Sequence, residues 1–586
     1  MPYIYLFETK SIQSYLGRTG QLKDLIAISD RLDNFIDEGD DCILGKVLLT
    51  LNKTYPDNPI NFIRRRGGSF YSYSNNKSAL QDFRKLWLLV FYQYFPYMHH
   101  TDYFGEISEE GDKFKTDISN AFKMLNASAN LAELQLPYST IAVEPDKSTG
   151  MPSVNYEQDL ASSTLKSIIF SEIFSVEKSV SERIYKKFIP ASKEMNIDEP
   201  SHKSLIKNFI QDFNRYQDTG SDLAYIHFDG NGIGQTIIKI RDSQENLNTY
   251  TQTMIGFSKA LSDSTMLAAK FAFAEVYRKV KSEGRNSFIF RPLVLGGDDL
   301  TLMIEPQFAF EYCVKYTAKF RELTKFNIYS ELTKKNLDKN ILNSIESFIK
   351  DGLTASGGIL FNKIKHPVSN TGSIVEGLAN KAKDLTKNKE ELPVLDKFKG
   401  RSAVAFYRMS TTSQESYDTI MSRGRVFECK VPETDCNSFR LGGGVYFIDS
   451  DIQYPNISNF IKFLEQLKES NPKSKEYSSV IPSFRKMMTS LSRNDFYEAK
   501  REYDLLLKKV NIDIKKELCK LFTLTDSNNH QSDNIDFNHN FYYQVVDADN
   551  KTVYLESPLA DLMVMHHFLH ADNMADKQNQ DGGSGK

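Results

Sequence analysis

The chain has 586 residues, of which 25% are charged and 12% are aromatic, and its formal net charge at pH 7 is −3. A length of this order predicts several domains, each with a core of its own, and the near-neutral charge gives no overall footprint of nucleic-acid binding. Five scattered cysteines argue against a disulfide framework and fit a reducing compartment. Charged residues occur within the first ten positions and no apolar run is long enough to cross a bilayer, so we expect neither a secretory signal nor a membrane span, and hence a cytoplasmic protein.

Residues 1–144 contain two short motifs that recur later in the chain. The early motifs are FETKSIQ from Phe7 and RGGSF from Arg66, and the later ones are FDGNGIG from Phe228 and LGGDDL from Leu295. The early pair keeps the glycines but loses most of the acids. We therefore expect the first segment to be a degenerate copy of a later domain.

A strand expected at 140–143 ends this first domain, and residues 145–222 are expected to form an intervening helical domain. Pro145, Gly150 and Pro152 give the start of this segment the composition of a turn-rich linker. The remainder is polar and is expected to be helical.

Residues 223–410 are predicted to have a βαββαβ order of elements. The expected elements are a strand at 223–228, a helix at 246–284, strands at 288–295 and 300–304, a helix at 307–325, a strand at 353–361 and a helix at 373–386. This order is that of a ferredoxin-like palm. Since the early motifs repeat those of this segment, we predict an α+β protein with two ferredoxin-like palms, the first degenerate and the second catalytic, plus helical domains.

The remaining residues are expected to be mostly helical over 411–577, after a strand near 445–448, and disordered over 578–586, where the sequence is polar and Gly-rich. Two basic clusters, the run Arg64-Arg65-Arg66 and the segment 473–520, are expected to be ordinary solvated surfaces.

The candidate catalytic and metal-binding residues are Asp229, Asp298 and Asp299. In a ferredoxin-like sheet the first strand and the central hairpin are neighbours, so the three carboxylates are expected to converge. Hard oxygen ligands suit Mg²⁺ or Mn²⁺, and two such ions would lower the pKa of an attacking hydroxyl and stabilise a leaving pyrophosphate. Gly-Gly-Asp-Asp alone is an ordinary turn sequence, and it is the Asp-Gly-Asn-Gly strand end upstream that favours catalysis.

The chain resembles the large, palm-domain subunit of type III CRISPR effector complexes, the subunit that makes cyclic oligoadenylate messengers. The resemblance covers about the first 410 residues. It rests on Phe7–Tyr15 with Gly20–Leu25, on Gly67–Phe70, Asp229–Gly232, Gly296–Asp299, Ser356–Ile359, His366-Pro367 and Ala382-Lys383, and on the late strand Ser402–Tyr407.

This resemblance implies a nucleotidyltransferase that joins ATP-derived adenylates into a cyclic oligoadenylate by two-metal catalysis at the second palm. Two ATP molecules would meet at the interface of the palms, and the partners would be other type III subunits with guide RNA and target RNA. The implied nucleotide-binding residues are Gly230, Asn231, Gly232, Gly296, Gly297, Ser356 and Lys383 in the second palm, and Gly67, Gly68 and Ser69 in the first.

Two of the charged residues have alternative interpretations. Lys383 matches a family position near the triphosphate, but an ordinary solvated helix lysine fits the sequence equally well. Glu8 aligns with Asp229 in the repeat. Because Ser69 and Phe70 replace the hairpin acids, a second full metal site is not expected, and we expect Glu8 to be a hydrogen-bonding or structural residue.

The chain also departs from the family. None of its ten histidines is followed by Asp, the mark of the family's nuclease domain, so no DNase is predicted. The cysteines contain no Cys-x-x-Cys pair, and the spacing of Cys429 and Cys436 is poor for structural zinc. His566, His567 and His570 are expected to be ordinary helix residues.

Several functional alternatives stay open. The enzyme could transfer AMP to another adenosine-containing acceptor such as S-adenosylmethionine, or the chain could be a non-catalytic scaffold subunit of the RNA-guided complex. A template-directed polymerase lacks an evident basic template channel. A guanine-using cyclic dinucleotide synthase is disfavoured because Asp299-Leu300 replaces the Glu-Phe of the related cyclases.

Overall fold

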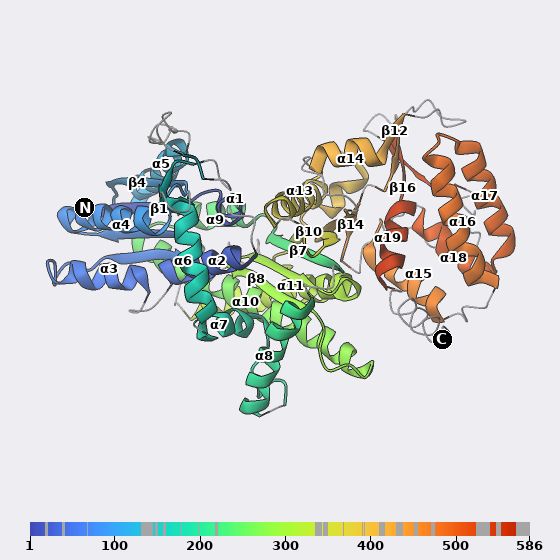
Figure 1. The fold of residues 1–586 in the computed structure, drawn as a ribbon. Helices are drawn as coiled ribbons and strands as arrows, with labels where there is room; N and C mark the ends of the chain where they lie inside the picture. Colours follow the sequence, from blue (N-terminus) through green and yellow to red (C-terminus); the bar gives the residue numbers. More distant parts are fainter. Residues whose placement is uncertain are drawn as a thin grey trace, which may run out of the picture.

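The structure is a computed structural model that describes residues 1–17, 22–37, 42–66, 68–129, 144–146, 151–155, 160–176, 178–196, 198–216, 221–334, 343, 350–366, 368–389, 391, 393–409, 417–428, 438–442, 444–449, 455–469, 475–522, 540–546 and 552–569. The second palm lies between the first palm and the C-terminal helices (Figure 1). Within the described part of the chain, no helix combines the length and apolar character needed to cross a bilayer.

The first palm is a four-stranded antiparallel sheet in the order β2-β3-β1-β4. Its strands are β1 (Tyr3–Thr9), β2 (Asn61–Arg66), β3 (Ser69–Ser74) and β4 (His100–Glu106). Its helices are α1 (Ile12–Leu16), α2 (Leu22–Ile36), α3 (Ile43–Asn52), α4 (Lys77–Tyr94) and α5 (Gly111–Ser128). The last strand lies beside the first, as a ferredoxin-like fold requires. The strand expected at 140–143 lies outside the described residues.

The second palm is a six-stranded sheet in the order β14-β11-β10-β7-β9-β8. Its strands are β7 (Asp222–Gly230), β8 (Phe290–Gly296), β9 (Asp299–Ile304), β10 (Ala355–Lys363), β11 (Ala403–Arg408) and β14 (Val445–Phe447). Its helical segments are α9 (Ile233–Asp242), α10 (Leu247–Ser282), η1 (Pro306–Phe308), α11 (Ala309–Thr333), α13 (Val368–Lys387) and η2 (Pro393–Phe398). Strands β7 to β10 repeat the order of the first sheet, which confirms the predicted α+β class.

Helices cover both faces of the second sheet, and this explains why β7 is an almost continuous apolar run with six successive buried residues. On one face, the ring of Phe228 meets that of Tyr316 on α11 with centroids 5.9 Å apart. On the other, α13 approaches β10 so closely that a Cβ on Gly358 would lie 2.6 Å from the Cβ of Leu378. This close approach fixes α13 against the strand that borders β7.

The predicted internal repeat is confirmed in the strand registers. In the first palm Phe7 on β1 pairs with Phe70 on β3, and in the second Phe228 on β7 pairs with Leu300 on β9. One residue further on, Glu8 pairs with Ser69, the position that corresponds to Asp229 beside Asp299. The two central hairpins are therefore equivalent, but the predicted alignment of their turns is wrong by one residue. Phe70 corresponds to Leu300, so Gly68 and Ser69, and not Ser69 and Phe70, stand at the positions of Asp298 and Asp299.

Backbone conformation repeats as well. Ser11 and Gly232, which precede α1 and α9, have φ angles of 53° and 68°, and the hairpin glycines Gly68 and Gly297 have φ angles of 72° and 62°. These left-handed conformations favour glycine. Ser11 nevertheless stands where the second palm has Gly232, and Gly68 lies one register position away from Gly297, so each hairpin has its own left-handed glycine.

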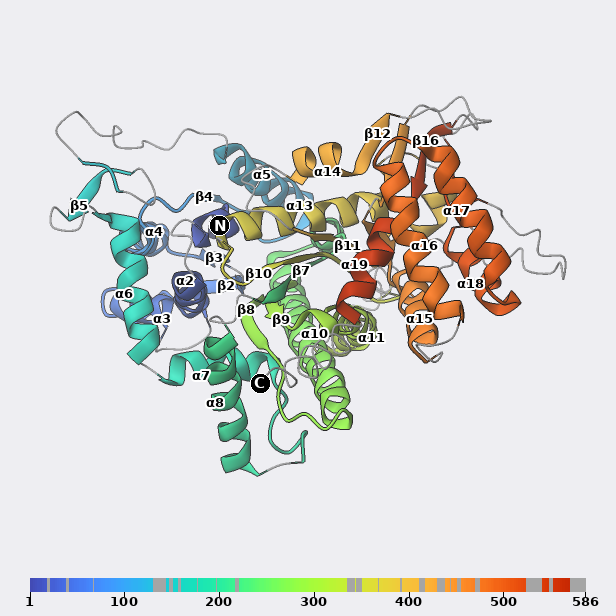
Figure 2. The ribbon, with the colours of Figure 1, turned by 45° about the vertical axis from the view of Figure 1, so that its right-hand side comes forward.

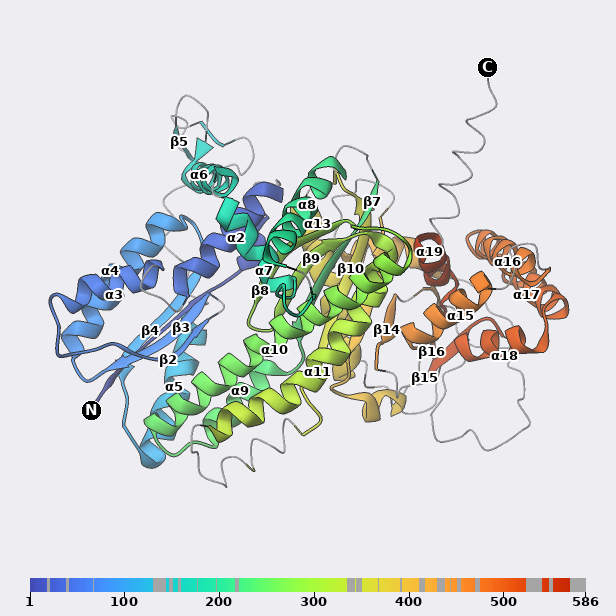
Figure 3. The same cartoon turned by 90° about the horizontal axis from the view of Figure 1, so that it is seen from below.

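The long helix α10 joins the two palms. At 1.5 Å per residue its 36 residues span roughly 54 Å, and it packs against β2 of the first palm and β8 and β9 of the second. Figure 3 shows α10 running alongside α11 beneath both sheets. Its start matches the prediction, because the side chain of Asn246 accepts a hydrogen bond from the Thr249 backbone N–H at 2.8 Å.

The segment between the palms contains β5 (Ser153–Asn155), β6 (Leu160–Ala161), α6 (Ser162–Val176), α7 (Lys178–Phe188) and α8 (Glu199–Tyr216). Helix α6 packs on α2 of the first palm, whereas α7 packs on β8 and α10 of the second. These helices therefore brace both palms. The predicted domain boundaries remain predictions.

The C-terminal part is mostly helical, with α14 (Tyr417–Arg425), α15 (Ile457–Glu469), α16 (Lys475–Leu491), α17 (Phe496–Lys509), α18 (Ile512–Leu521) and α19 (Leu559–Leu569). It also contains a four-stranded sheet, β12-β13-β16-β15, which the sequence does not indicate. Its strands are β12 (Val426–Glu428), β13 (Ser438–Leu441), β15 (Tyr543–Val546) and β16 (Thr552–Ser557). Helix α19 lies between α16 and the palm sheet (Figure 2). Residues 578–586 lie outside the described part.

Candidate active site between the two palms

The three predicted aspartates meet where β7 ends beside the β8–β9 hairpin. Since Phe228 pairs with Leu300, Asp229 lies next to Asp299 at the mouth of the hairpin, and the negative charge of Asp229 acts on both Asp298 and Asp299. Gly230 permits this approach, because a Cβ at that position would lie 2.9 Å from Oδ2 of Asp298.

The three carboxyl groups differ in their pKa values. Burial and the charge of Asp229 raise the pKa of Asp298 to about 7, and they also raise the pKa of Asp299 well above its ordinary value. Burial acts in the same direction on Asp229 and is the largest single effect there, but the charge of Lys383, together with the interactions of Asp229 with Asp298 and His227, lowers the pKa of that group. Three negative charges at this point are therefore costly until a cation neutralises them.

Lys383 is not a solvated surface lysine. Its side chain is 15% exposed, and its Nζ forms an ion pair with Oδ2 of Asp229, whose side chain is 31% exposed. The pair joins α13 to the end of β7. Lys383 thus neutralises one carboxylate of the cluster, while its predicted contact with a nucleotide remains a prediction.

The donor atoms of the cluster suit a divalent cation, because they are partly buried carboxylate oxygens. Two of these carboxyl groups have raised pKa values. Among the described residues, however, no group of three or more His, Cys, Asp or Glu side chains has the arrangement of a complete metal site. The Asp229–Lys383 ion pair is the contact with which a cation would compete.

Asn231 and Ser356 tie the turn after β7 to its neighbours. The side-chain N–H groups of Asn231 donate to the Ser356 hydroxyl at 2.9 Å and to the Arg401 carbonyl at 3.0 Å, and the Ala403 backbone N–H donates to the same hydroxyl at 3.0 Å. The Ser356 side chain is fully buried. These contacts favour a structural role for both side chains.

The corresponding point of the first palm has its own network. Glu8 accepts hydrogen bonds from Lys10 Nζ at 2.6 Å and from the Tyr71 hydroxyl at 2.5 Å. Burial would raise the pKa of Glu8, but the hydrogen bonds from Lys10 and Tyr71 and the charges of Lys10 and Arg64 lower it. The interpretation of Glu8 as a hydrogen-bonding residue agrees with this geometry.

The early hairpin is tightly packed. A Cβ on Gly68 would lie 2.3 Å from Oγ1 of Thr9, and the buried Ser69 hydroxyl donates to the Arg66 carbonyl at 3.0 Å. Gly67 lies outside the described residues.

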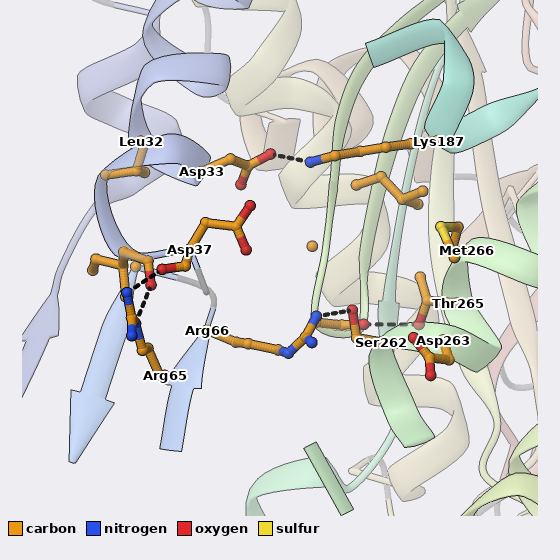
Figure 4. A pocket seen from close by; sticks show the side chains of 15 residues that line it. Leu32, Asp33, Asp37, Arg65, Arg66, Lys187, Ser262, Asp263, Thr265 and Met266 are labelled. Carbon is orange, nitrogen blue, oxygen red and sulfur yellow. Dashed lines mark hydrogen bonds and ion pairs between the residues drawn. The ribbon is translucent and has the colours of Figure 1, made fainter. Parts of the chain in front are cut away.

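A cavity of about 220 Å³ lies between the two palms, and hairpin glycines of both line it, Gly68 from the first palm and Gly296 and Gly297 from the second. Figure 4 looks into this interpalm cavity, where Arg66 of the first palm reaches Ser262 on α10 at 3.0 Å. The structure thus brings the predicted glycines of the two palms together.

Charged side chains of both signs surround the interpalm cavity. Lys187 on α7 pairs with Asp33 on α2 at 2.7 Å (Figure 4), and the Thr265 hydroxyl on α10 donates to the Gly297 carbonyl at 2.8 Å. The intervening helices therefore take part in the walls of this cavity, which the sequence does not indicate.

The arginine run of β2 is not a solvated surface, so that expectation is wrong. Arg65 Nε donates to the Ile36 carbonyl at the end of α2 at 3.1 Å. The positive charge of Arg64 lowers the pKa of both Glu8 and Asp298, so it acts on the equivalent points of the two palms. Its Nε is buried and donates no hydrogen bond within the described part of the chain. In the sequence, the only indication that Arg64 lies near the site is its position shortly before the glycine hairpin.

The family comparison agrees with this geometry. Residues 222–392 match the model of the Cas10/Cmr2 family described as its second palm domain. This part of the chain is a palm domain. More particularly, it is similar to the Cas10/Cmr2 second palms, so the chain contains a Cas10-like palm. A search of curated proteins gives no match.

Among solved structures, a chain of the Csm1-Csm4 cassette in complex with AMPPNP is 12% identical, with a TM-score of 0.36, and the match covers 65% of this chain and 53% of that one. A chain of the same cassette in complex with pppApApA is 11% identical, with a TM-score of 0.44 and coverage of 87% and 64%. Csm1 in T.onnurineus is 12% identical, with a TM-score of 0.36 and coverage of 89% and 67%. The chain thus spans only 53% and 64% of the first two chains.

Proposed function

We propose that this chain is a cytoplasmic nucleotidyltransferase that joins ATP-derived adenylates into a cyclic oligoadenylate at its second palm. The observation that carries the proposal is the convergence of Asp229, Asp298 and Asp299 at a hairpin next to a cavity that the first palm also lines. The match of residues 222–392 to the model of the Cas10/Cmr2 second palm domain supports it.

The residues have separable tasks in this proposal. Divalent cations bound at the three carboxylates would lower the pKa of an attacking hydroxyl and stabilise a leaving pyrophosphate. Lys383, once released from Asp229, is placed to pair with phosphate oxygens. The Gly296-Gly297 backbone borders the interpalm cavity and lets a nucleotide approach the hairpin closely.

The first palm supplies the second nucleotide site without a second set of hairpin acids. Glu8 is already engaged by Lys10 and Tyr71, so it has no role in a second metal site. Arg64 brings a positive charge between the palms, where triphosphates of two facing nucleotides would otherwise repel each other. Other type III subunits carrying guide and target RNA are the proposed partners.

Product identification tests this function. The purified chain, with and without candidate partner subunits and target RNA, is incubated with Mn²⁺ and each nucleoside triphosphate, and the products are identified by mass spectrometry. Cyclic oligoadenylate from ATP alone is the expected product. A product that forms only when S-adenosylmethionine is added would indicate AMP transfer to that acceptor instead of cyclic oligoadenylate synthesis. The absence of any ATP-derived product under all conditions would favour a non-catalytic scaffold.

A further inference from the structure

A second cavity, of about 510 Å³, lies where the second palm meets the C-terminal part. Strand β11, helix α14, strands β12 and β13, and helices α16 and α19 all contribute to its walls. Its volume and its place at a junction of structural units are those of small-molecule sites. We call it the junction cavity.

The ionisable side chains among the described residues that line the junction cavity are all arginine or histidine: Arg408, Arg425, Arg485, His566 and His567. No described acid lines it. Such a set attracts an anion, and arginine suits phosphate in particular because its planar fork can donate two parallel hydrogen bonds.

Two of the arginines are held in place by acids that lie outside the cavity lining. Arg408 Nη2 pairs with Asp222 Oδ2 at 3.2 Å, and its guanidinium carbon lies 5.3 Å from the ring centroid of Phe568. Arg425 Nη1 lies 3.5 Å from Asp561 Oδ1 and donates to the Leu441 carbonyl at 3.0 Å. Since a guanidinium has five N–H donors, these contacts fix each arginine and leave it further donors for a ligand.

Arg485 on α16 is the third arginine, and it is different from the other two. Its side chain is exposed, and within the described part of the chain it forms no hydrogen bond or ion pair. An arginine with no partner at the rim of a cavity is available to bind a ligand, and changing it leaves no buried group unsatisfied.

Apart from Ser492, the rest of the lining is apolar and includes Phe427, Leu441, Met488, Met563 and Val564. Flexible, polarisable methionine side chains adapt to flat or irregular groups. The ligand that fits the whole cavity therefore combines an anionic group with an uncharged, flat body.

We propose that the junction cavity binds a nucleotide, with its phosphate at the three arginines and its base against the apolar wall. The bound nucleotide is either a free mononucleotide or the 5′-phosphorylated end of an oligonucleotide, since both present a phosphate next to a base. The site is separate from the active site: Arg408 pairs with Asp222 at one end of β7, whereas Asp229 lies at the other, seven residues and hence roughly 23 Å away.

Equilibrium titration of the full chain tests the site. Fluorescence anisotropy with labelled AMP is measured in EDTA, so that the outcome does not depend on cations or on nucleotidyl transfer. Competition with unlabelled AMP, with a 5′-phosphorylated triadenylate and with inorganic phosphate identifies the source. Tighter binding of AMP indicates a free mononucleotide, and tighter binding of the triadenylate indicates an oligonucleotide end. Both results support the site.

The informative variant is Arg485→Glu, and its matched control is Arg493→Glu, an exposed arginine just beyond α16 that does not line the cavity. We expect Arg485→Glu to weaken AMP binding at least tenfold and Arg493→Glu to change it less than twofold, with unchanged melting temperatures and unchanged ATP turnover for both. Equal effects of the two variants, inorganic phosphate that binds as tightly as AMP, or no AMP binding by the wild type would each overturn the proposal.

Discussion

Lys383 on α13 and Asp229 at the end of β7 form an ion pair, although 154 residues separate them in the chain. The pair neutralises the acid that bridges Asp298 and Asp299. In the proposed function, cations held by the three carboxylates would remove the need for this pairing and free the ammonium group for a phosphate. Lys383 would then pair with Asp229 in the empty site and with the nucleotide in the loaded one.

Replacing Lys383 by alanine should raise the KM for ATP about tenfold or more, because a hydrogen bond to a charged group is worth about 1.5–3 kcal/mol. Steady-state kinetics at saturating Mn²⁺ measures this, and Lys383→Arg should restore part of the loss. A KM that stays at the wild-type value in Lys383→Ala would reduce the lysine to a structural counter-ion.

Arg64 is expected to assist catalysis from the first palm. Its charge acts on Asp298 across the interface, and its buried Nε has no partner among the described residues. Arg64→Ala should lower kcat/KM for ATP on the order of tenfold, while the distant exposed variant Arg493→Ala leaves it unchanged. Equal kinetics for the two variants would show that Arg64 serves packing alone.

Glu8 is expected to matter for stability and not for turnover. Its pKa is lowered in the folded chain by Lys10 and Tyr71 against the effect of burial. The folded state therefore binds protons less tightly than the unfolded state, so the stability from this group is present above the ordinary pKa of 4.5 and is lost as pH falls through the lower, folded value.

Denaturant unfolding from pH 3 to pH 7 should show this loss in the wild type and a flatter profile in Glu8→Gln. ATP consumption at neutral pH should stay within about twofold in the same variant. A large fall in turnover would instead assign Glu8 to the chemistry.

Gly358 is expected to control the position of α13. A Cβ there would lie 2.6 Å from the Leu378 Cβ and 2.6 Å from the Val375 carbonyl oxygen, and forced overpacking of this kind costs about 1–3 kcal/mol. Gly358→Ala should lower the free energy of unfolding by that amount and displace the helix that carries Lys383. Gly372→Ala, where a Cβ meets nothing within 4 Å, is the control. Equal stability of the two variants would contradict the close approach.

The core of the site could be predicted because its information is local. Asp229 follows an apolar strand, and Asp298 and Asp299 occupy a glycine hairpin. The ferredoxin-like strand order places the end of that strand beside the hairpin. The repeat could be predicted for the same reason, since both copies keep a glycine-containing turn between two short strands, although the register shifts the expected alignment of the turns by one residue.

The remainder depends on contacts between segments far apart in the sequence. Nothing local indicates that Lys187 of the intervening helices reaches Asp33 of the first palm, 154 residues away. The C-terminal sheet was missed because β13 pairs in parallel with β16, more than a hundred residues later, Phe439 opposite Leu555. Arg64 was assigned to the surface because sequence reports its charge but not its burial.

The most direct test of the central claim is ATP consumption by the double variant Asp298→Ala/Asp299→Ala in Mn²⁺, alone and with candidate partner subunits and target RNA. The exposed helix acid Asp504→Ala is the matched control. We predict that the double variant loses ATP consumption and adenylate products while the control retains both. Turnover at the wild-type rate in the double variant would place the chemistry elsewhere and contradict the account.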